Sequence, residues 1–185
     1  QATRANGTLY AIPFIINVQL LCVNKQKVKN TPQTFNELIE ISRSGVSIAI
    51  GGNFLETIWG LPGFNARLFG TNKSSAEDLK DGLSNWIKTL RKSDEEPNIA
   101  LFKNSSLMTR YFAEGKISII NCESIDLPFL REELGPENLG ISELPSINGK
   151  NSEPRLTGAS FVLNPFANKN QTKLALRFSN YAISV

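Results

Sequence analysis

The sequence contains no histidine, and this absence excludes several kinds of catalytic and metal site. Serine and cysteine nucleophiles of the common triads need an imidazole base, and many zinc sites need imidazole as a ligand. The remaining candidate nucleophile is Cys122, which lies beside Glu123 with Lys116 nearby in sequence. A thiol needs a base or a positive field to ionise. Because Cys122 ends an apolar stretch, we expect no enzymatic activity, no catalytic residue, no cofactor and no metal site.

The cysteines Cys22 and Cys122 are too few for a disulfide framework or a zinc site. Each lies in an apolar stretch typical of a strand, namely residues 20–23 and 119–122. This setting favours the interpretation that both are small buried hydrophobic side chains. A disulfide between them is the alternative, and it requires their Cα atoms to lie within about 7 Å.

Composition indicates a folded domain without a nucleic-acid partner. The 185 residues are 41% hydrophobic and 20% charged, with a formal net charge of +3, and no basic cluster stands out. No stretch resembles a signal peptide, and the apolar run Tyr10–Ile16 is interrupted by Pro13 and is far short of the ~20 residues of a membrane span. Both ends look cut, so we expect a piece of a longer protein.

Strands and helices alternate along the chain, which predicts α/β layers. Thr34 with Glu37 forms a capping box, and residues 74–77 form a second one, so each predicts a helix start. Trp86 lies on the apolar stripe of the second helix and is expected in the core. A helix over 54–69 should be distorted at Pro62. Further strands are expected at 8–23, 46–50, 116–122, 140–144 and 156–163, and further helices at 107–114, 124–134 and 168–184.

A series of short motifs follows this framework in a specific order. They are NGTLYAIPF at 6–14, LLCVNK at 20–25, TPQTFNEL at 31–38, FAEGKIS at 112–118, ELP at 143–145, TGAS at 157–160, ANKN at 167–170 and FSNY at 178–181. In this order and at these spacings they resemble the extracellular solute-binding proteins of ABC importers, in the sugar-binding group that includes maltose-binding protein. The resemblance covers about residues 6–184.

The resemblance implies one lobe of a type 2, clamshell, periplasmic-binding-protein-like fold, with a central mixed sheet and flanking helices. Residues 17–156 would form the second α/β lobe. Residues 1–16 would be a strand crossing from a first lobe, most of which is missing. Residues 157–185 would be a crossing strand and a helix that return to that first lobe.

The resemblance also implies where a ligand would bind. Asn17 takes the place of an acidic residue that contacts sugar hydroxyls, and its amide can still donate and accept. The alternative is a polar strand-edge residue. After the next strand, Phe54 and Glu56 are the expected contacts at a helix start, where glycines let a ligand approach the backbone. Trp59 matches a position that packs behind the site, so a core role is favoured over direct contact.

The third element of the expected site follows the strand that ends at Asn121. Asn121, Glu123 and Ser124 are the expected ligand contacts of this element, and Ser124 stands where sugar binders often have a tryptophan platform. This departure argues against a maltose-like ligand and favours a smaller or more polar solute. Glu123 with Asp126 is also a candidate cation site, although acidic residues at helix starts are common because of the helix dipole.

Three functions remain open from the sequence. The favoured one is a solute-binding component of an ABC importer, located in the periplasm or outside the cell, either free or lipid-anchored, with ABC permease subunits as partners. Its ligand would be a small polar solute, a sugar or related polyol, held without catalysis. A ligand-sensing effector domain is the alternative from another class, and an enzyme on the same fold is less favoured.

The segment 157–185 carries an apolar face that the first lobe would cover. Phe161, Leu163, Leu174, Phe178 and Tyr181 would otherwise lack partners. The segment can fold back onto the strand at 9–16, or the chain can pair with a second copy as a homodimer. Because the exposed apolar area would be contiguous, we expect self-association.

Overall fold

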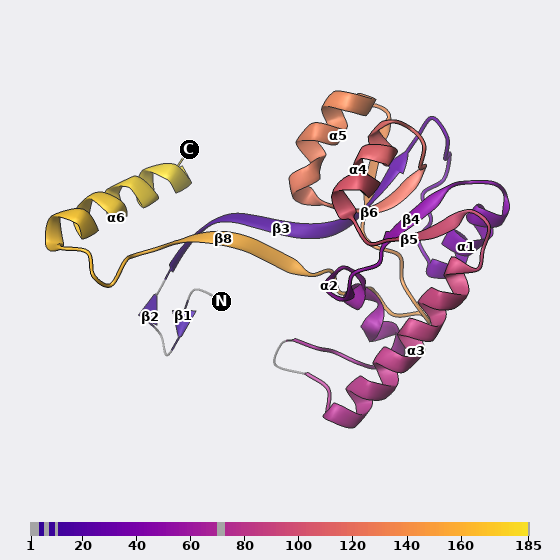
Figure 1. Ribbon diagram of the computed structural model, residues 1–185, viewed down its shortest axis with the longest axis horizontal. Coiled ribbons are helices and arrows are strands. Elements are labelled where there is room, and N and C mark those ends of the chain that lie inside the picture. Colours follow the sequence, from indigo (N-terminus) through magenta and orange to yellow (C-terminus); the bar gives the residue numbers. More distant parts are fainter. Residues whose placement is uncertain (1–3, 6–7, 10, 70–72, 185) are drawn as a thin grey trace. The chain divides into compact units, whose positions relative to one another are not determined.

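A mixed β-sheet with helices on both faces forms the larger part of the computed structural model, which describes all residues except 1–3, 6–7, 10, 70–72 and 185 (Figure 1). The chain divides into two units. We call Val18–Arg155 the sheet unit, and Gln1–Asn17 together with Leu156–Val185 the ribbon unit. The sequence-based boundaries at 16/17 and 156/157 each differ from these by one residue. A return of residues 157–185 to a first lobe stays a prediction.

The sheet unit is built around five strands in the order β5-β4-β6-β3-β7. Strand β4 pairs in parallel with β5 and β6, whereas β3 pairs antiparallel with β6 and β7, so the sheet is mixed as predicted. The strands are β3 (Ala11–Asn24), β4 (Ile48–Gly51), β5 (Ile99–Phe102), β6 (Ile119–Glu123) and β7 (Leu139–Ser142). Strand β3 begins in the ribbon unit.

Alternate residues of these buried strands supply two separate cores, because successive side chains point to opposite faces of a sheet. Ile48 and Ile119 face one core, whereas Ala49 and Ile120 face the other. Helices α1 and α3 cover the first face, and α4 and α5 cover the second. These helices are α1 (Phe35–Arg43), α3 (Ala76–Asp94), α4 (Ser105–Ala113) and α5 (Leu127–Leu134).

Local capping accounts for the helix starts. The Thr34 hydroxyl accepts from the Glu37 amide at 3.1 Å, and Ser75 accepts from the Asp78 amide at 3.1 Å. The Glu37 carboxylate reaches back to the amide of Gln33 rather than to that of Thr34. Each cap satisfies an N–H group that has no partner within its helix. The predicted helix starts near Thr34 and Ser75 are therefore confirmed.

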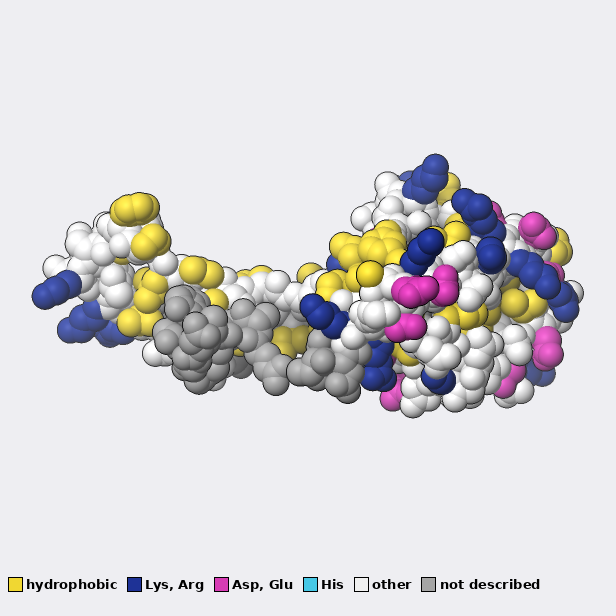
Figure 2. Space-filling model, turned by 90° about the horizontal axis from the view of Figure 1, so that it is seen from below, with side chains coloured by type: hydrophobic (Ala, Val, Ile, Leu, Met, Phe, Trp, Pro, Cys, Tyr) yellow, Lys and Arg dark blue, Asp and Glu magenta, His cyan; other side chains and the backbone are white. Residues whose placement is uncertain are grey.

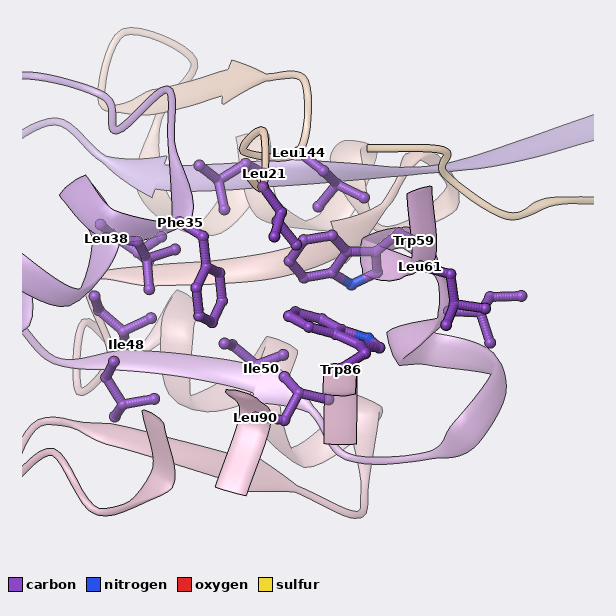
Figure 3. Packing of buried hydrophobic residues seen from close by; sticks show 14 of the residues in the cluster. Leu21, Phe35, Leu38, Ile48, Ile50, Trp59, Leu61, Trp86, Leu90 and Leu144 are labelled. Atoms are coloured by element: carbon purple, nitrogen blue, oxygen red, sulfur yellow. The ribbon is translucent and has the colours of Figure 1, made fainter. Parts of the chain in front are cut away.

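Aromatic rings fill the centre of the first core (Figure 3). Trp86 is 1% exposed, as predicted, and its indole nitrogen donates to the Thr57 carbonyl at 2.6 Å. The ring of Trp59 packs against it in a T-shaped arrangement with centroids 5.2 Å apart. The indole nitrogen of Trp59 is buried and has no hydrogen-bond partner among the described residues.

The region 54–69 differs from the long helix that we predicted. It forms only α2 (Phe54–Thr57) followed by a 3₁₀ segment, η1 (Ile58–Phe64). Pro62 lacks the N–H that a longer α-helix would need. A side chain at Gly60 would also collide with the ring of Trp86, so the backbone here must pass close to the core.

Strand β5 was not predicted from the sequence, because its four residues are too short a run to show a clear period.

The structure joins Cys22 and Cys122 in a disulfide, with Cα atoms 5.8 Å apart. Both are buried, as expected, but they are not the separate thiols that the sequence favoured. The antiparallel register pairs Leu20 with Cys122 and Cys22 with Ile120, which brings the cysteines together.

The ribbon unit has little interior of its own. Its elements are β1 (Arg4–Ala5), β2 (Thr8–Leu9), the first part of β3, β8 (Leu156–Val162) and α6 (Lys169–Ser184). Strand β8 pairs with β3, and Phe161 stacks on Phe14 with ring centroids 4.4 Å apart. Phe178 packs edge-on against Phe161 but remains 62% exposed. The segment therefore folds back onto β3, which is the route that our sequence analysis disfavoured.

Charged side chains are interspersed on the face of the molecule seen in Figure 2. In the sheet unit basic and acidic groups alternate over this face, whereas the charged groups visible on the ribbon unit are all basic. The mixture on the sheet unit produces no strong directional field. Within the described residues no helix is long and apolar enough to cross a membrane.

Candidate functional site

A buried glutamine connects three segments of the sheet unit. Gln19 lies on β3, directly opposite Glu123 in the register with β6, and is 2% exposed. Its side-chain nitrogen donates to the Glu56 carbonyl at 3.0 Å, and its side-chain oxygen accepts from the Arg155 amide at 3.0 Å. The one amide group therefore fixes the end of α2 and the segment before β8 to the central strand.

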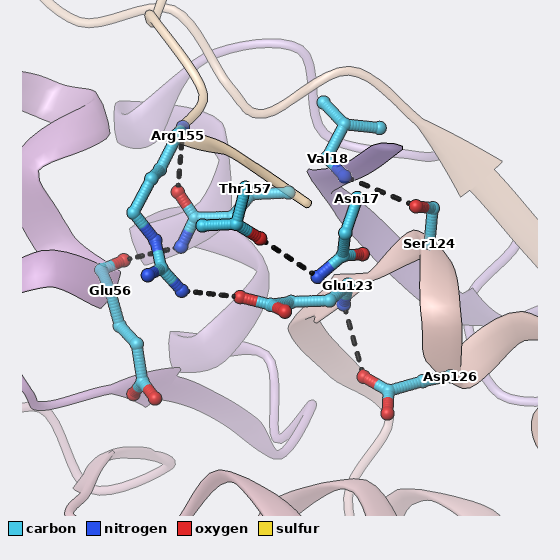
Figure 4. Close-up of polar contacts among 9 residues, drawn as sticks. Asn17, Val18, Glu56, Glu123, Ser124, Asp126, Arg155 and Thr157 are labelled. Carbon is cyan, nitrogen blue, oxygen red and sulfur yellow. Dashed lines mark hydrogen bonds and ion pairs between the residues drawn. The ribbon is translucent and has the colours of Figure 1, made fainter. Parts of the chain in front are cut away.

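An ion pair lies next to this amide. The Arg155 guanidinium donates to the Glu123 carboxylate at 2.7 Å (Figure 4), and both side chains are partly buried. The buried Nε of Arg155 has no hydrogen-bond partner among the described residues. Charge-assisted hydrogen bonds of this kind are stronger than neutral ones. The pair thus holds a fixed guanidinium edge and a fixed carboxylate beside Gln19.

Asp126 shapes the turn that follows β6. Asp126 accepts from the Glu123 amide at 3.1 Å, which closes the turn η2 (Ser124–Asp126) into α5. Burial raises the pKa of Asp126 above its usual value, and this effect outweighs the hydrogen bond from the Glu123 amide, which lowers it. Among the described residues no group of three or more acidic or cysteine side chains could hold a metal ion.

Helix α2 supplies an exposed aromatic ring and a carboxylate. Phe54 is its first residue and is 51% exposed, whereas Glu56 is partly buried. The Oε2 atom of Glu56 is buried and has no hydrogen-bond partner among the described residues. Helix α2 therefore carries an exposed ring and a partly buried carboxylate two residues apart, and small-molecule sites combine apolar and polar groups of this kind.

The structure gives Trp59, Asn121 and Ser124 roles in holding the sheet unit together. Trp59 is 1% exposed within the aromatic core, which is the core role that the sequence favoured. The Asn121 side chain accepts from the Gly51 amide at 2.7 Å and joins β6 to β4. The Ser124 hydroxyl accepts from the Val18 amide at 3.1 Å. Contact of any of these three with a ligand stays a prediction.

Asn17 belongs to the ribbon unit, whereas the other predicted site residues belong to the sheet unit. Its side-chain nitrogen donates to the Thr157 hydroxyl at 3.3 Å, which joins β3 to β8. The convergence of Asn17, Phe54, Glu56, Glu123 and Ser124 on one concavity stays a prediction. Within the sheet unit, Glu56 and Glu123 are linked through Gln19 and Arg155.

Gln19 and Arg155 organise this region, and neither was predicted from the sequence. One signal for Gln19 was present, since a glutamine between Val18 and Leu20 interrupts an apolar strand that is otherwise buried. Buried amides are normally fully hydrogen-bonded, so such a residue indicates a polar partner across the fold. No comparable signal marked Arg155, because its partner Glu123 lies on a distant strand.

Comparison with known proteins gives no matching family model but clear relatives. The chain is 28% identical over 195 aligned residues to a protein of Streptococcus pneumoniae serotype 4 named maltooligosaccharide ABC transporter solute-binding lipoprotein, covering 91% of this chain and 44% of the relative. It is 23% identical to the maltodextrin-binding protein MdxE of Bacillus subtilis, covering 98% of this chain and 48% of that protein. The chain therefore spans about half the length of these relatives.

Solved structures show the same fold. Maltose-bound MalE3 of T. maritima superposes with a TM-score of 0.83 at 15% identity, over 97% of this chain and 51% of that one. An extracellular solute-binding protein from Staphylococcus aureus in complex with maltose gives 0.72 at 22% identity, over 97% of this chain and 50% of that one. The fold is thus that of one part of a type 2 periplasmic-binding protein, as predicted.

The sequence relatives make the resemblance more specific than the fold does. Both are solute-binding proteins, one of them named as part of an ABC transporter. The likeness to the sugar-binding group of these proteins, which the order of motifs indicated, is confirmed. The relatives are binding proteins by name rather than enzymes. The disulfide, moreover, leaves no free thiol in a chain whose only cysteines are Cys22 and Cys122.

Proposed function

We propose that this chain is part of the solute-binding component of an ABC importer and binds a hydroxyl-rich solute, a sugar or related polyol, without catalysis. The observation that carries this proposal is the match of 91% of the chain to a solute-binding lipoprotein of a maltooligosaccharide transporter. Because the chain spans about half of that relative, it would hold about half of the binding site, in a cleft closed by a second lobe.

The geometry of the sheet unit supports this ligand class. A sugar hydroxyl both donates and accepts, and the region of Gln19 offers the matching groups, the Glu123 carboxylate as acceptor and the Arg155 guanidinium as donor. The exposed ring of Phe54 would pack against the apolar face of a sugar ring. Together these features compensate for the absent tryptophan at Ser124.

The partners follow from the same proposal. The full-length protein would work outside the cytoplasm, free or lipid-anchored, and would deliver its solute to ABC permease subunits. A disulfide within the sheet unit suits such an oxidising location. The exposed apolar side chains of the ribbon unit would be covered by a further lobe or, in this chain alone, by a second copy.

Tryptophan fluorescence offers a direct test. Trp86 donates to the carbonyl of Thr57, the residue after Glu56, so a ligand held at α2 should change the indole environment. We expect titration with maltotriose to change the emission at millimolar concentrations, and Phe54→Ala to weaken this binding by roughly two- to tenfold. Phe129→Ala, which removes a similarly exposed ring from α5, is the matched control. No response to maltotriose, maltose or glucose would contradict the proposal.

A further inference from the structure

Helix α6 in the ribbon unit carries basic residues at a regular spacing. Lys169, Lys173 and Arg177 follow one another at intervals of four residues, so they lie on one face of the helix. All three are exposed, and none of the ion pairs that the described residues form includes one of them. We call these three residues the basic stripe, which extends about 12 Å along the helix.

No acidic residue of the ribbon unit balances the basic stripe. All 17 aspartates and glutamates lie between positions 37 and 153, so this unit has none, and Arg4 gives it a further basic residue. Basic and hydrophobic groups lie together on it in Figure 2. Helix α3 of the sheet unit, by contrast, combines four basic with four acidic residues. The positive charge of α6 is therefore uncompensated within its own unit.

The apolar side chains of α6 lie on a different face from the basic stripe. Leu174, Phe178 and Tyr181 are spaced by four and three residues, and each is at least 62% exposed. Ser179, which is 3% exposed, marks a third face that is turned inward. A lobe or a second copy that covers the apolar face would therefore leave the basic stripe accessible.

The basic stripe also places like charges next to one another. Residues four positions apart on a helix are neighbours, and like charges in such pairs destabilise the helix. The pairs Lys169–Lys173 and Lys173–Arg177 thus oppose the formation of α6 when they face only water. A negatively charged surface would complement all three charges at once. Charge complementarity therefore predicts an anionic partner for this face of α6.

The arrangement of the stripe indicates which anionic partner fits. Its side chains are long, exposed and evenly spaced along a line, which suits negative charges spread over a surface better than one anion in a pocket. A second copy is a poor partner, because its ribbon unit carries the same positive charge. Helices with a basic face and an apolar face are typical of anionic membrane surfaces. We infer that the basic stripe of α6 docks on the negatively charged lipid headgroups of a membrane.

Docking through the stripe would orient the protein on the membrane. Each basic side chain near an anionic surface strengthens binding by about fivefold, so three together give about a hundredfold. This is too little for stable attachment alone, and stable attachment takes two signals, such as a lipid anchor with a basic patch. The inference goes beyond the proposed function, because none of the residues that we propose to contact the sugar belongs to the stripe.

Binding of the chain to lipid vesicles tests the inference. Vesicles of equal parts phosphatidylglycerol and phosphatidylcholine provide a negative surface, and vesicles of phosphatidylcholine alone are the neutral control. In sedimentation with vesicles at low salt, we expect binding to the negative surface to be stronger by about a hundredfold. Added salt should weaken it steeply, because salt screens interactions between exposed charges. Equal binding to both kinds of vesicle would overturn the inference.

A variant of the stripe identifies the surface that binds. Lys169→Gln/Lys173→Gln/Arg177→Gln should lower binding to the negative vesicles by about a hundredfold, to the level of the neutral ones. Glutamine is a good helix former, and the substitutions remove the repulsion between like charges, so α6 should persist. Circular dichroism checks that the helix content is kept. Unchanged binding by this variant would show that the stripe is not the docking surface.

The matched control removes the same charge from another helix. Lys80→Gln/Lys88→Gln/Arg91→Gln changes three exposed basic residues of α3, and we expect its binding to stay within about twofold of the unchanged chain. Equal weakening by both variants would show that net charge rather than the stripe governs binding, and would overturn the inference. A chain that self-associates and binds no negative vesicles would contradict it as well.

Discussion

Large apolar side chains are buried in the sheet unit and exposed in the ribbon unit. In the sheet unit, every strand lies against at least one of two cores, and large side chains such as Trp59, Trp86 and Phe112 are at most 1% exposed. In the ribbon unit, Phe166 is 93% exposed and Tyr181 is 70% exposed. Composition does not explain this contrast, because both units contain many aromatic and aliphatic residues.

The contrast teaches that the sheet unit has a self-contained core and the ribbon unit does not. A sheet covered by helices on both faces can bury its strands completely. A two-stranded pairing with one helix has only one layer to pack, and it is marginally stable without further cover. We therefore expect stability to depend on the sheet unit, and association to depend on the ribbon unit.

Loss of a core ring should have the largest effect on stability, and it tests this comparison most strongly. Trp86→Ala should lower the free energy of unfolding by about 3–5 kcal/mol, because it opens a cavity and removes the hydrogen bond to Thr57. Phe178→Ala, in the ribbon unit, should cost less than about 1 kcal/mol. Urea unfolding followed by circular dichroism measures both, and similar losses would contradict the contrast between the units.

The disulfide should have the next largest effect. It joins residues with a sequence separation of 100 inside the sheet unit, so removing it frees a long loop in the unfolded chain. We expect Cys22→Ala/Cys122→Ala to lower the free energy of unfolding by about 2–4 kcal/mol. The same urea experiment, with and without reductant, should show a lower midpoint for the reduced chain. An unchanged midpoint would show that the bond adds nothing to the sheet unit.

The hydrogen bonds of Gln19 should have a smaller but measurable effect. Gln19→Ala leaves the Arg155 amide and the Glu56 carbonyl without their partner, at a cost of about 1–3 kcal/mol. Gln33→Ala is the matched control, because Gln33 is exposed and its side chain contacts only the nearby Thr31 carbonyl in the described contacts. Equal stability of the two variants would mean that the amide of Gln19 does not connect its three segments.

The smallest expected effect is the pH dependence of stability that the Asp126 carboxyl causes. Because burial raises the pKa of Asp126 in the folded chain above the ordinary 3.8, the folded state holds this proton more tightly than the unfolded state. The stability of the unchanged chain relative to Asp126→Asn should therefore fall as pH rises from 3.8 through the raised pKa, and then remain constant. Unfolding of both proteins across this range measures the difference. A flat or rising difference would show that burial does not govern this carboxyl.

Much of the sheet unit could be predicted from short-range patterns. The cap at Thr34 depends on a neighbour three residues away, so the sequence shows it directly, whereas the second cap pairs Ser75 with Asp78, one residue later than the box predicted at 74–77. The order of motifs pointed to the fold class even though no single motif was specific. The predicted site was less complete, because Phe54, Glu56 and Glu123 could be named by position, while Gln19 and Arg155, which connect them, could not.

The sequence by itself determined the helix starts, the α/β class, the core position of Trp86 and the lack of histidine chemistry. Each of these depends on residue type or on spacing within a few turns of the chain. Only the tertiary structure decided the pairing of Cys22 with Cys122, the link through Gln19 and the ion pair of Arg67 with Glu153. These contacts join residues from 37 to 136 positions apart, and which of them meet depends on strand register and on packing, since a shift of one residue turns each side chain to the opposite face.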